Sequence, residues 1–290
     1  MPAFKKEARV MLFKKTYTLA ASVAALALAL TGCSGAPASP ATSAAPSPNQ
    51  AASSSAPAVD YKLVTPGTLT ICSDIPYKPF EFEDASAPTG YTGFDIEVVD
   101  AIAKKLGLTL KVVVTNFDAL QSGTALEANS CDMAASAMTI TDERKKNLDF
   151  ADGYYDSLQS LLVKTSSGIT NLAGTSGKRI GLQKGSTGKL YATKNAPKDA
   201  TLVDFADDGK MWIALQAGQV DALLQDLPVN HQHEVDDADY KIVETFKTNE
   251  QYGFALAKDK KPELLAAVNA ELKSMHSDGS YDTIYKKYFG

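Results

Sequence analysis

The segment from Thr139 to Arg144 has residues of a kind and order that could bind an anion. Thr141 is a good helix N-cap, and the acidic side chains of Asp142 and Glu143 suit the positive end of a helix. Arg144 does not, because a guanidinium in the first turn opposes the helix dipole. An anion held between Arg144 and the free backbone N–H groups would explain this placement. The alternative is that Arg144 pairs with Asp142 or points into water.

The N-terminus has the order of parts found in an export signal. Its basic residues are Lys5, Lys6, Arg9, Lys14 and Lys15. An apolar run over residues 19–30 follows, too short for a comfortable transmembrane helix, and small residues lead into Cys33. This order resembles a bacterial lipobox. We therefore predict a signal peptide over residues 1–32 and a lipid anchor on Cys33, with Met11 as a possible alternative start; an ordinary signal peptide with a chance cysteine is the other reading.

The segment after Cys33 is rich in Ala, Ser, Pro and Thr and has no charge between residues 34 and 58. It cannot bury a core, so residues 33–59 are predicted to be the lipidated cysteine and a flexible tether. The whole chain has a formal net charge of −5, and removal of the signal with its five basic and one acidic residues leaves −9. Such an acidic chain argues against nucleic acid and against a grip on anionic lipid.

The two remaining cysteines, Cys72 and Cys131, form an even pair in an exported protein. Each lies beside a predicted strand, and adjacent strands could bring them together. We predict a disulfide between them, with two buried free thiols as the alternative. No histidine lies near either cysteine in sequence, so a catalytic role is not expected.

Strand and helix patterns alternate in two series along residues 60–290. The first series has strands at 69–73, 108–114 and 133–135 and helices at 94–106 and 119–128. The second has strands at 179–182, 201–203 and 222–224 and helices at 190–195 and 211–217. Two such series imply two α/β units with parallel sheets. Extended segments at 158–164 and 253–257 are expected to cross between the units, and helices at 262–276 and 281–289 are expected to return to the first.

Several ordered motifs resemble the extracellular solute-binding proteins of family 3, the polar amino-acid receptors of ABC importers. The motifs lie at residues 69–82, 93–96, 138–146, 149–155 and 285–289. The glutamine and the lysine/arginine/ornithine/histidine receptors are the most similar types. The resemblance implies an α/β fold of the periplasmic-binding-protein-like type II, with two lobes joined by two crossing strands. Lobe 1 would comprise residues 60–163 plus 253–290, and lobe 2 residues 164–252.

The resemblance also implies a clamp for the charged groups of a free amino acid. Arg144 matches the arginine that takes the ligand α-carboxylate, and Thr139 with the backbone near Ala137 completes that subsite. Asp226 matches the carboxylate that receives the α-ammonium, and Ser136 matches a position that supports the ammonium through its oxygen atoms. An amino-acid zwitterion needs such a pair of opposite charges.

The ligand side chain would lie between Tyr77 and Phe117 and meet Asp74 at its far end. In the loop that begins at Lys184, Thr187 and backbone amides would also bind the carboxylate. The segment after Phe117 is about two residues longer than in the glutamine receptor. Taken singly, Asp74 could cap a strand and the two aromatic residues could belong to the core. Asp74 suits a cationic side chain, whereas Lys184 would disfavour one and suit glutamine.

The expected function is that of a substrate-binding lipoprotein of an ABC importer, not an enzyme. It would work as a monomer without metal or cofactor, with a free polar amino acid and the permease subunits as partners. It would be extracytoplasmic and held at the cell membrane by its lipid. Two alternatives remain: an enzyme on the same fold, similar to cyclohexadienyl dehydratases, and a ligand-sensing subunit of a signalling system.

Two further features have bland interpretations. His231 and His233 have the spacing of a zinc pair, but no further ligands are obvious nearby, so a solvated loop is favoured. Trp212 lies in an amphipathic stretch and is expected in the core.

Overall fold

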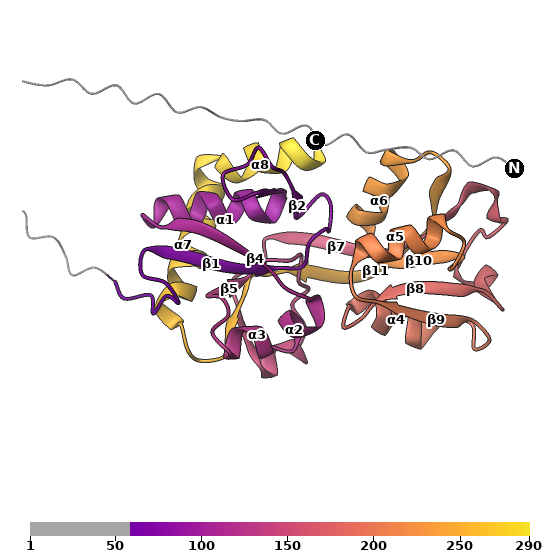
Figure 1. The fold of residues 1–290 in the computed structure, drawn as a ribbon, viewed down its shortest axis with the longest axis horizontal. Coiled ribbons are helices and arrows are strands. Elements are labelled where there is room, and N and C mark those ends of the chain that lie inside the picture. Colours follow the sequence, from indigo (N-terminus) through magenta and orange to yellow (C-terminus); the bar gives the residue numbers. More distant parts are fainter. Residues whose placement is uncertain (1–58) are drawn as a thin grey trace, which may run out of the picture. The chain divides into compact units, whose positions relative to one another are not determined.

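The computed structural model describes residues 59–290. The predicted signal peptide over residues 1–32, Cys33 and the tether up to residue 58 lie outside the described residues. Between residues 59 and 290, none of the helices is long and apolar enough to cross a membrane. This part of the chain builds two five-stranded sheets, each with helices on both faces (Figure 1). We call the half built on the first sheet lobe 1 and the half built on the second sheet lobe 2.

The sheet of lobe 1 has the strand order β4-β1-β5-β12-β6. Its strands are β1 (Thr68–Ser73), β4 (Thr109–Val114), β5 (Met133–Ala134), β6 (Leu148–Phe150) and β12 (Ala255–Ala257). β1 pairs in parallel with β4 and β5, whereas β12 is antiparallel to β5 and β6. Because β12 comes late in the chain and lies between two earlier strands, lobe 1 is complete only after the chain has passed through lobe 2.

The helices of lobe 1 cover both faces of its sheet (Figure 1). On one face lie α1 (Phe94–Lys105), α7 (Pro262–Asp278) and α8 (Ser280–Phe289), and on the other α2 (Phe117–Gln121) and α3 (Thr124–Glu127). Each face has its own cluster of buried apolar side chains. A short hairpin of β2 (Phe82–Glu83) and β3 (Tyr91–Thr92) precedes α1, and the 3₁₀ helix η1 (Arg144–Lys146) precedes β6.

The sheet of lobe 2 has the strand order β11-β7-β10-β8-β9. Its strands are β7 (Tyr155–Lys164), β8 (Arg179–Gln183), β9 (Thr201–Phe205), β10 (Ala222–Asp226) and β11 (Tyr240–Tyr252). The helices are α4 (Thr187–Asn195), α5 (Asp208–Gln216) and α6 (Leu227–Asp236), with the 3₁₀ helices η2 (Thr165–Ser167) and η3 (Leu172–Thr175) after β7. β8, β9 and β10 are parallel, and β7 and β11 add antiparallel strands. The two predicted α/β units are therefore present.

The two lobes are joined through β7 and β11, which pair with each other from Tyr155↔Tyr252 to Tyr240↔Lys164. Both strands are hydrogen-bonded into the sheet of lobe 2, so that sheet begins at Tyr155 and not at residue 164. The segment 253–257 was expected to cross between lobes. Residues 255–257 instead form β12 inside the first sheet, and their complete burial is that of a central strand.

Three helices differ from the sequence prediction. The single helix expected at 119–128 is two short helices, because Gly123 between them has φ 84°, a left-handed conformation. α4 begins earlier than expected, at Thr187, where the side chain of Ser186 caps it by accepting from the Lys189 N–H. The segment with the two histidines is the helix α6, not a solvated loop. His233 is largely buried and its ring stacks on that of Trp212 at 4.2 Å between centroids.

The predicted disulfide is confirmed. Cys72 in β1 and Cys131 just before β5 are bonded, with their Cα atoms 5.7 Å apart. β1 and β5 are neighbouring parallel strands, which is the arrangement that brings the two cysteines together. The bond therefore fixes the two strands that lead to Asp74 and Ser136.

Candidate functional site

A polar cavity lies between the two lobes; the atom-free space there is about 320 Å³, open solvent at its mouth included. It is lined by Asp74, Tyr77, Phe117, Ser136, Ala137, Thr139 and Arg144 of lobe 1 and by Gln183, Ser186, Thr187 and Asp226 of lobe 2. All of the predicted site residues except Lys184 line it. Loops at the ends of β1, β5, β8 and β10 supply most of these side chains, so the parallel strands determine where they meet.

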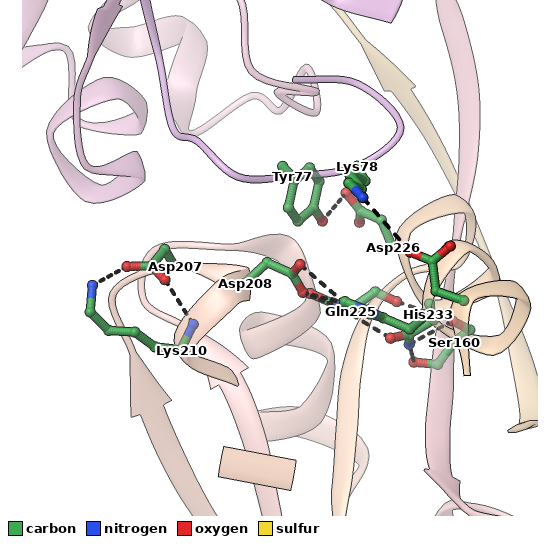
Figure 2. Close-up of polar contacts among 11 residues, drawn as sticks. Tyr77, Lys78, Ser160, Asp207, Asp208, Lys210, Gln225, Asp226 and His233 are labelled. Carbon is green, nitrogen blue, oxygen red and sulfur yellow. Dashed lines mark hydrogen bonds and ion pairs between the residues drawn. The ribbon is translucent and has the colours of Figure 1, made fainter. Parts of the chain in front are cut away.

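Asp226 is the buried carboxylate that lobe 2 contributes to the cavity. It ends β10 and stands at the start of α6. Tyr77 from lobe 1 donates a 2.8 Å hydrogen bond to its Oδ2 atom, as Figure 2 shows, and the Gln159 amide donates to Oδ1. Burial raises the pKa of Asp226 to about 7, and the charge of Glu250 adds to the rise. A nearby cation would therefore be favourable here.

A network of buried polar side chains in lobe 2 holds the strand end that carries Asp226 (Figure 2). The amide of its neighbour Gln225 donates to Asp208 at 2.7 Å and to Asn230 at 3.0 Å. Asn230 in turn donates to the Ser160 hydroxyl at 2.9 Å, and Asp208 lies 3.0 Å from the Nε2 atom of His233. These hydrogen bonds hold the backbone beside the cavity, although the Gln225 Oε1 atom is buried without a partner.

Arg144 is the buried cation of the cavity and is only 5% exposed. Its guanidinium donates to the backbone carbonyls of Thr139 at 2.7 Å and of Gly185 at 3.0 Å, and it lies 5.1 Å from the centre of the Phe117 ring. Neither alternative for this residue holds, because it is buried and bonds to carbonyls and not to Asp142. Thr141 is not the N-cap, because η1 begins at Arg144 with Glu143 in that position, but its hydroxyl accepts from the Arg144 N–H at 3.1 Å.

The electrostatics of Arg144 suit an anionic partner. Within residues 59–290 it has no carboxylate within ion-pair distance, 4.0 Å. Burial lowers the pKa of Arg144 to about 10, while the charges of Asp226 and Glu250 oppose that change. A buried guanidinium still has donors to spare after two carbonyl contacts, so a carboxylate in the cavity would satisfy it.

Asp74 is a second buried carboxylate on the lobe 1 side of the cavity. Its Oδ2 atom accepts from the backbone N–H of Phe117 at 3.1 Å and from the amide of Gln183 in lobe 2. Burial raises the pKa of Asp74 to about 7, although these hydrogen bonds oppose the rise. No cation forms an ion pair with it among the described residues, although the charge of Lys210 also opposes the rise.

Two fully buried acids stand behind the cavity wall at Ser136 and Ala137. The Ser136 hydroxyl donates to Glu81 at 2.8 Å, and the Ala137 N–H donates to Asp95 at 2.8 Å. Burial raises the pKa of both acids, that of Asp95 to about 7. The hydroxyl hydrogen of Ser136 is already used in the hydrogen bond to Glu81. Toward a ligand, this hydroxyl can therefore only accept a hydrogen bond. That property suits an ammonium group.

Glu250 and Gln159 also contribute to the site, and the sequence interpretation missed both. The hydroxyls of Thr139 and Thr187 donate to Glu250, and the Gln159 amide lies 3.1 Å from both of its carboxylate oxygens. Gln183 and Ser186 in the cavity lining were missed too. Two signals could have pointed to them: Gln183 is a polar residue at a strand end, and Ser186 is an N-cap.

Lys184 does not reach the cavity. Its ammonium forms a 2.7 Å ion pair with Asp118 of lobe 1, and its side chain is 60% exposed. The pair lies at the surface, where Lys184 is partly neutralised by its partner. The expectation that Lys184 would oppose a cationic ligand therefore loses its basis.

The two α/β lobes enclose a cavity that has a buried guanidinium on one side and a buried carboxylate on the other. This arrangement is that of a two-lobed receptor for small charged ligands. The chain belongs to the bacterial extracellular solute-binding proteins, family 3, whose pattern matches residues 69–290. The resemblance and the type II fold expected from the sequence are thereby confirmed. Members of this family are extracellular or periplasmic solute-binding proteins.

Three relatives illustrate the family. The chain is 36% identical over 198 residues to the ABC transporter glutamine-binding protein GlnH of Bacillus subtilis. The aligned region covers 68% of this chain and 72% of GlnH. An ancestral arginine-binding protein bound to arginine has a TM-score of 0.71 and 36% identity, over 77% of this chain and 99% of the other. The ancestral amino acid-binding protein AncCDT-1, a precursor of cyclohexadienyl dehydratase, has a TM-score of 0.69 and 36% identity, over 77% and 96%.

Proposed function

We propose that this protein is the solute receptor of an ABC importer and that it captures a free amino acid, with arginine or lysine preferred over glutamine. The similarity to glutamine- and arginine-binding proteins supports an amino acid as the ligand. The charges of the side chains that line the cavity, Asp74 above all, support a ligand with a cationic side chain.

The observation that carries the proposal is the pairing of opposite charges across the cavity. Arg144 in lobe 1 is a buried cation without a carboxylate partner, and Asp226 in lobe 2 is a buried carboxylate with a raised pKa. An amino-acid zwitterion would neutralise both charges, with its α-carboxylate bound to Arg144 and its α-ammonium bound to Asp226. Ser136, which can only accept, would take a further ammonium hydrogen bond. The backbone N–H of Thr139 would complete the carboxylate side, whereas the Ala137 N–H already donates to Asp95.

The rest of the cavity favours a cationic side chain. Asp74 carries a raised pKa and has no cationic partner, so a guanidinium or ammonium beside it would relieve the cost of its burial. Tyr77 and Phe117 offer aromatic faces that attract a cation by about 0.5 to 2 kcal/mol. Lys184 is engaged outside the cavity with Asp118. Nothing in the lining other than Arg144 would repel a positive side chain.

Ligand binding and lobe closure would be coupled through these residues. Tyr77 reaches Asp226 across the lobes, and Arg144 of lobe 1 donates to the carbonyl of Gly185 in lobe 2. A ligand that bridges Arg144 and Asp226 adds free energy to the closed arrangement alone. The permease would then distinguish the closed receptor from the open one.

The proposal is of a binding protein and not an enzyme. AncCDT-1 is an amino acid-binding protein on this fold. Both buried carboxyls of the present cavity have a place in ligand binding, Asp226 with the α-ammonium and Asp74 with the side chain. A cyclohexadienyl dehydratase assay on the purified protein is therefore expected to give no turnover. A sensing subunit would bind the same ligand, so a permease pull-down distinguishes sensing from transport.

Export and lipid attachment are part of the same proposal. The basic N-terminus, the apolar run over residues 19–30 and Cys33 support a lipoprotein, and the segment to residue 59 would be its tether. Metabolic labelling with a palmitate analogue is expected to mark the protein, and Cys33→Ser is expected to abolish the mark. A labelled C33S protein would contradict the lipid site.

The first test of the ligand is a thermal-shift screen of the protein against the twenty amino acids and ornithine, followed by calorimetry. A ligand that binds only the folded form raises the melting temperature. We expect the largest shifts with arginine, lysine and ornithine, and a smaller one with glutamine. A shift with glutamate alone would contradict the proposed side-chain preference, and no shift with any of them would contradict the proposed function.

A further inference from the structure

Glu250 is a buried carboxylate on β11, one of the two strands that join the lobes. It stands at a register shift in the pairing of β11 with β7, between Phe246 and Glu250. Glu250 does not line the cavity, but two residues that do, Thr139 and Thr187, are bonded to it. It therefore lies directly behind the cavity wall.

A single oxygen of Glu250 is shared by the two lobes. Its Oε2 atom accepts from the Thr139 hydroxyl of lobe 1 at 2.7 Å and from the Thr187 hydroxyl of lobe 2 at 2.8 Å. The two hydroxyl oxygens are 3.4 Å apart. The Gln159 amide, on the other joining strand, lies 3.1 Å from both carboxylate oxygens. This arrangement can exist only while Thr139 and Thr187 are close together, which requires closed lobes.

The same bonds limit what the two threonines can do for a ligand. A hydroxyl can donate one hydrogen bond, and both Thr139 and Thr187 donate theirs to Glu250. Toward the cavity they present lone pairs, which cannot bind a carboxylate. A ligand carboxylate would then depend on Arg144 and on backbone N–H groups, so Thr139 and Thr187 would act on closure more than on direct recognition.

We propose that Glu250 is a positioning residue that fastens Thr139 and Thr187 to each other across the closed lobes and so couples the joining strands to ligand capture. This inference rests on the proposed function, since it concerns the affinity for amino acids. Glu250 touches no side-chain subsite. Besides the two hydroxyls, its charge acts on Asp226 and Arg144, which face the groups that all amino acids share, so it contributes equally to every amino acid that the receptor binds.

The test uses Glu250→Gln, which keeps the shape of the side chain and removes its charge. Glu244→Gln is the matched control: it lies on the same strand and its carboxylate accepts from the Leu172 N–H at 2.6 Å, all within lobe 2. We expect E250Q to weaken arginine, lysine and glutamine binding by a similar factor of about tenfold, measured by calorimetry, and E244Q to stay within about twofold of the unmodified protein.

A second set of variants separates positioning from a general structural role. Thr187→Val removes the hydroxyl, and Thr187→Ser keeps it. We expect T187V to weaken binding about as much as E250Q, T187S to retain affinity, and the double variant E250Q/T187V to be no weaker than the weaker single one. Additive losses in the double variant, or a loss in T187S equal to that of T187V, would overturn the proposal. If E250Q does not fold, the threonine variants decide alone.

Small-angle scattering gives a readout that does not depend on the ligand. Without added amino acid, E250Q and T187V are expected to have a larger radius of gyration than the unmodified protein and E244Q. Equal radii for all four proteins would overturn the coupling to closure. If no amino acid binds even the unmodified protein, the proposed function fails, while the scattering comparison still decides the role of Glu250.

Discussion

The hydroxyl of Tyr77 donates a 2.8 Å hydrogen bond to Asp226, which lies 149 residues further along the chain. The two residues belong to different lobes, so the bond forms only when the lobes meet. A carboxylate has about four lone-pair sites, and Tyr77 and Gln159 take one oxygen each of Asp226. An ammonium group can therefore join these contacts without displacing them. Asp226 can close the receptor and bind the ligand with the same side chain.

Arg144→Ala should weaken amino-acid binding on the order of 30-fold to several thousand-fold, because truncating one partner of an enclosed charge pair costs about 2 to 5 kcal/mol. Calorimetric titration with arginine and glutamine measures the loss. Arg179→Ala is the control, since Arg179 pairs with Asp221 at the surface of lobe 2. A loss below threefold in R144A would remove Arg144 from the proposed site.

Asp74→Asn should discriminate between ligands by their side chains. We expect arginine and lysine to bind about tenfold more weakly, because the carboxylate that faces their charge is lost, and glutamine to change by less than about threefold. Asp118→Asn serves as the control, because Asp118 pairs with Lys184 outside the cavity. Equal losses for arginine and glutamine in D74N would mean that Asp74 does not contact the side chain.

The affinity for arginine should rise with pH through the neutral range. Asp74 and Asp226 both have pKa values raised to about 7, and a cationic ligand binds their ionised forms. Binding then releases protons below about pH 7, and the affinity levels off above about pH 8. Calorimetry at pH 6 in two buffers of different ionisation enthalpy measures the protons released. Proton uptake on binding would contradict the assignment.

The stability of the ligand-free protein should show the opposite trend from the same two groups. Their folded pKa values lie above the ordinary 3.8, so the folded protein binds more protons than the unfolded one between about pH 4 and 7. Their contribution to the free energy of unfolding therefore falls as pH rises through that window. Denaturant melts at pH 5 and pH 7.5 test this. In Asp226→Asn part of the pH dependence should disappear.

Lys261→Met should destabilise lobe 1 by about 3 to 5 kcal/mol without a direct effect on the binding site. Lys261 and Asp132 form a 2.5 Å ion pair in which both side chains are almost fully buried. Its neighbour Lys260 pairs with Glu127 at the surface, so Lys260→Met should cost less than about 1 kcal/mol. Urea melts of the two variants, compared side by side, check the difference. Equal costs would show that burial does not set the strength of these pairs.

The parts of the site that were predictable are those with a local signature. The Thr141 hydroxyl that accepts from the Arg144 N–H is such a case. Asp74 and Asp226 were implied by the resemblance to the family and not by a local pattern. The alternation of strand and helix predicted two α/β units because amphipathic periodicity is a property of short segments. The disulfide was predicted from an even pair of cysteines in an exported protein, each beside a predicted strand, and the structure shows that β1 and β5 are neighbours.

The parts that escaped prediction depend on tertiary register. Gln159 and Glu250 lie 91 residues apart, and they meet only because β7 and β11 pair over their length. Nothing in the residues around Glu250 marks it as buried. The prediction for Lys184 was wrong for a related reason, because its side chain pairs with Asp118, which belongs to the other lobe. Contacts between lobes leave no local pattern in a sequence.

The disulfide between Cys72 and Cys131 has a consequence for the place where this receptor becomes competent. Cys72 lies two residues before Asp74, and Cys131 lies five residues before Ser136. The Asp74 N–H donates to the Ser136 hydroxyl at 3.0 Å. Oxidation of the thiols thus sets the spacing of the cavity wall. A copy of the chain that is still in a reducing cytosol would lack that constraint and would bind amino acids more weakly. It would therefore leave the free amino acids of the cytosol unbound. Comparing the arginine affinity of the reduced and oxidised protein measures the difference.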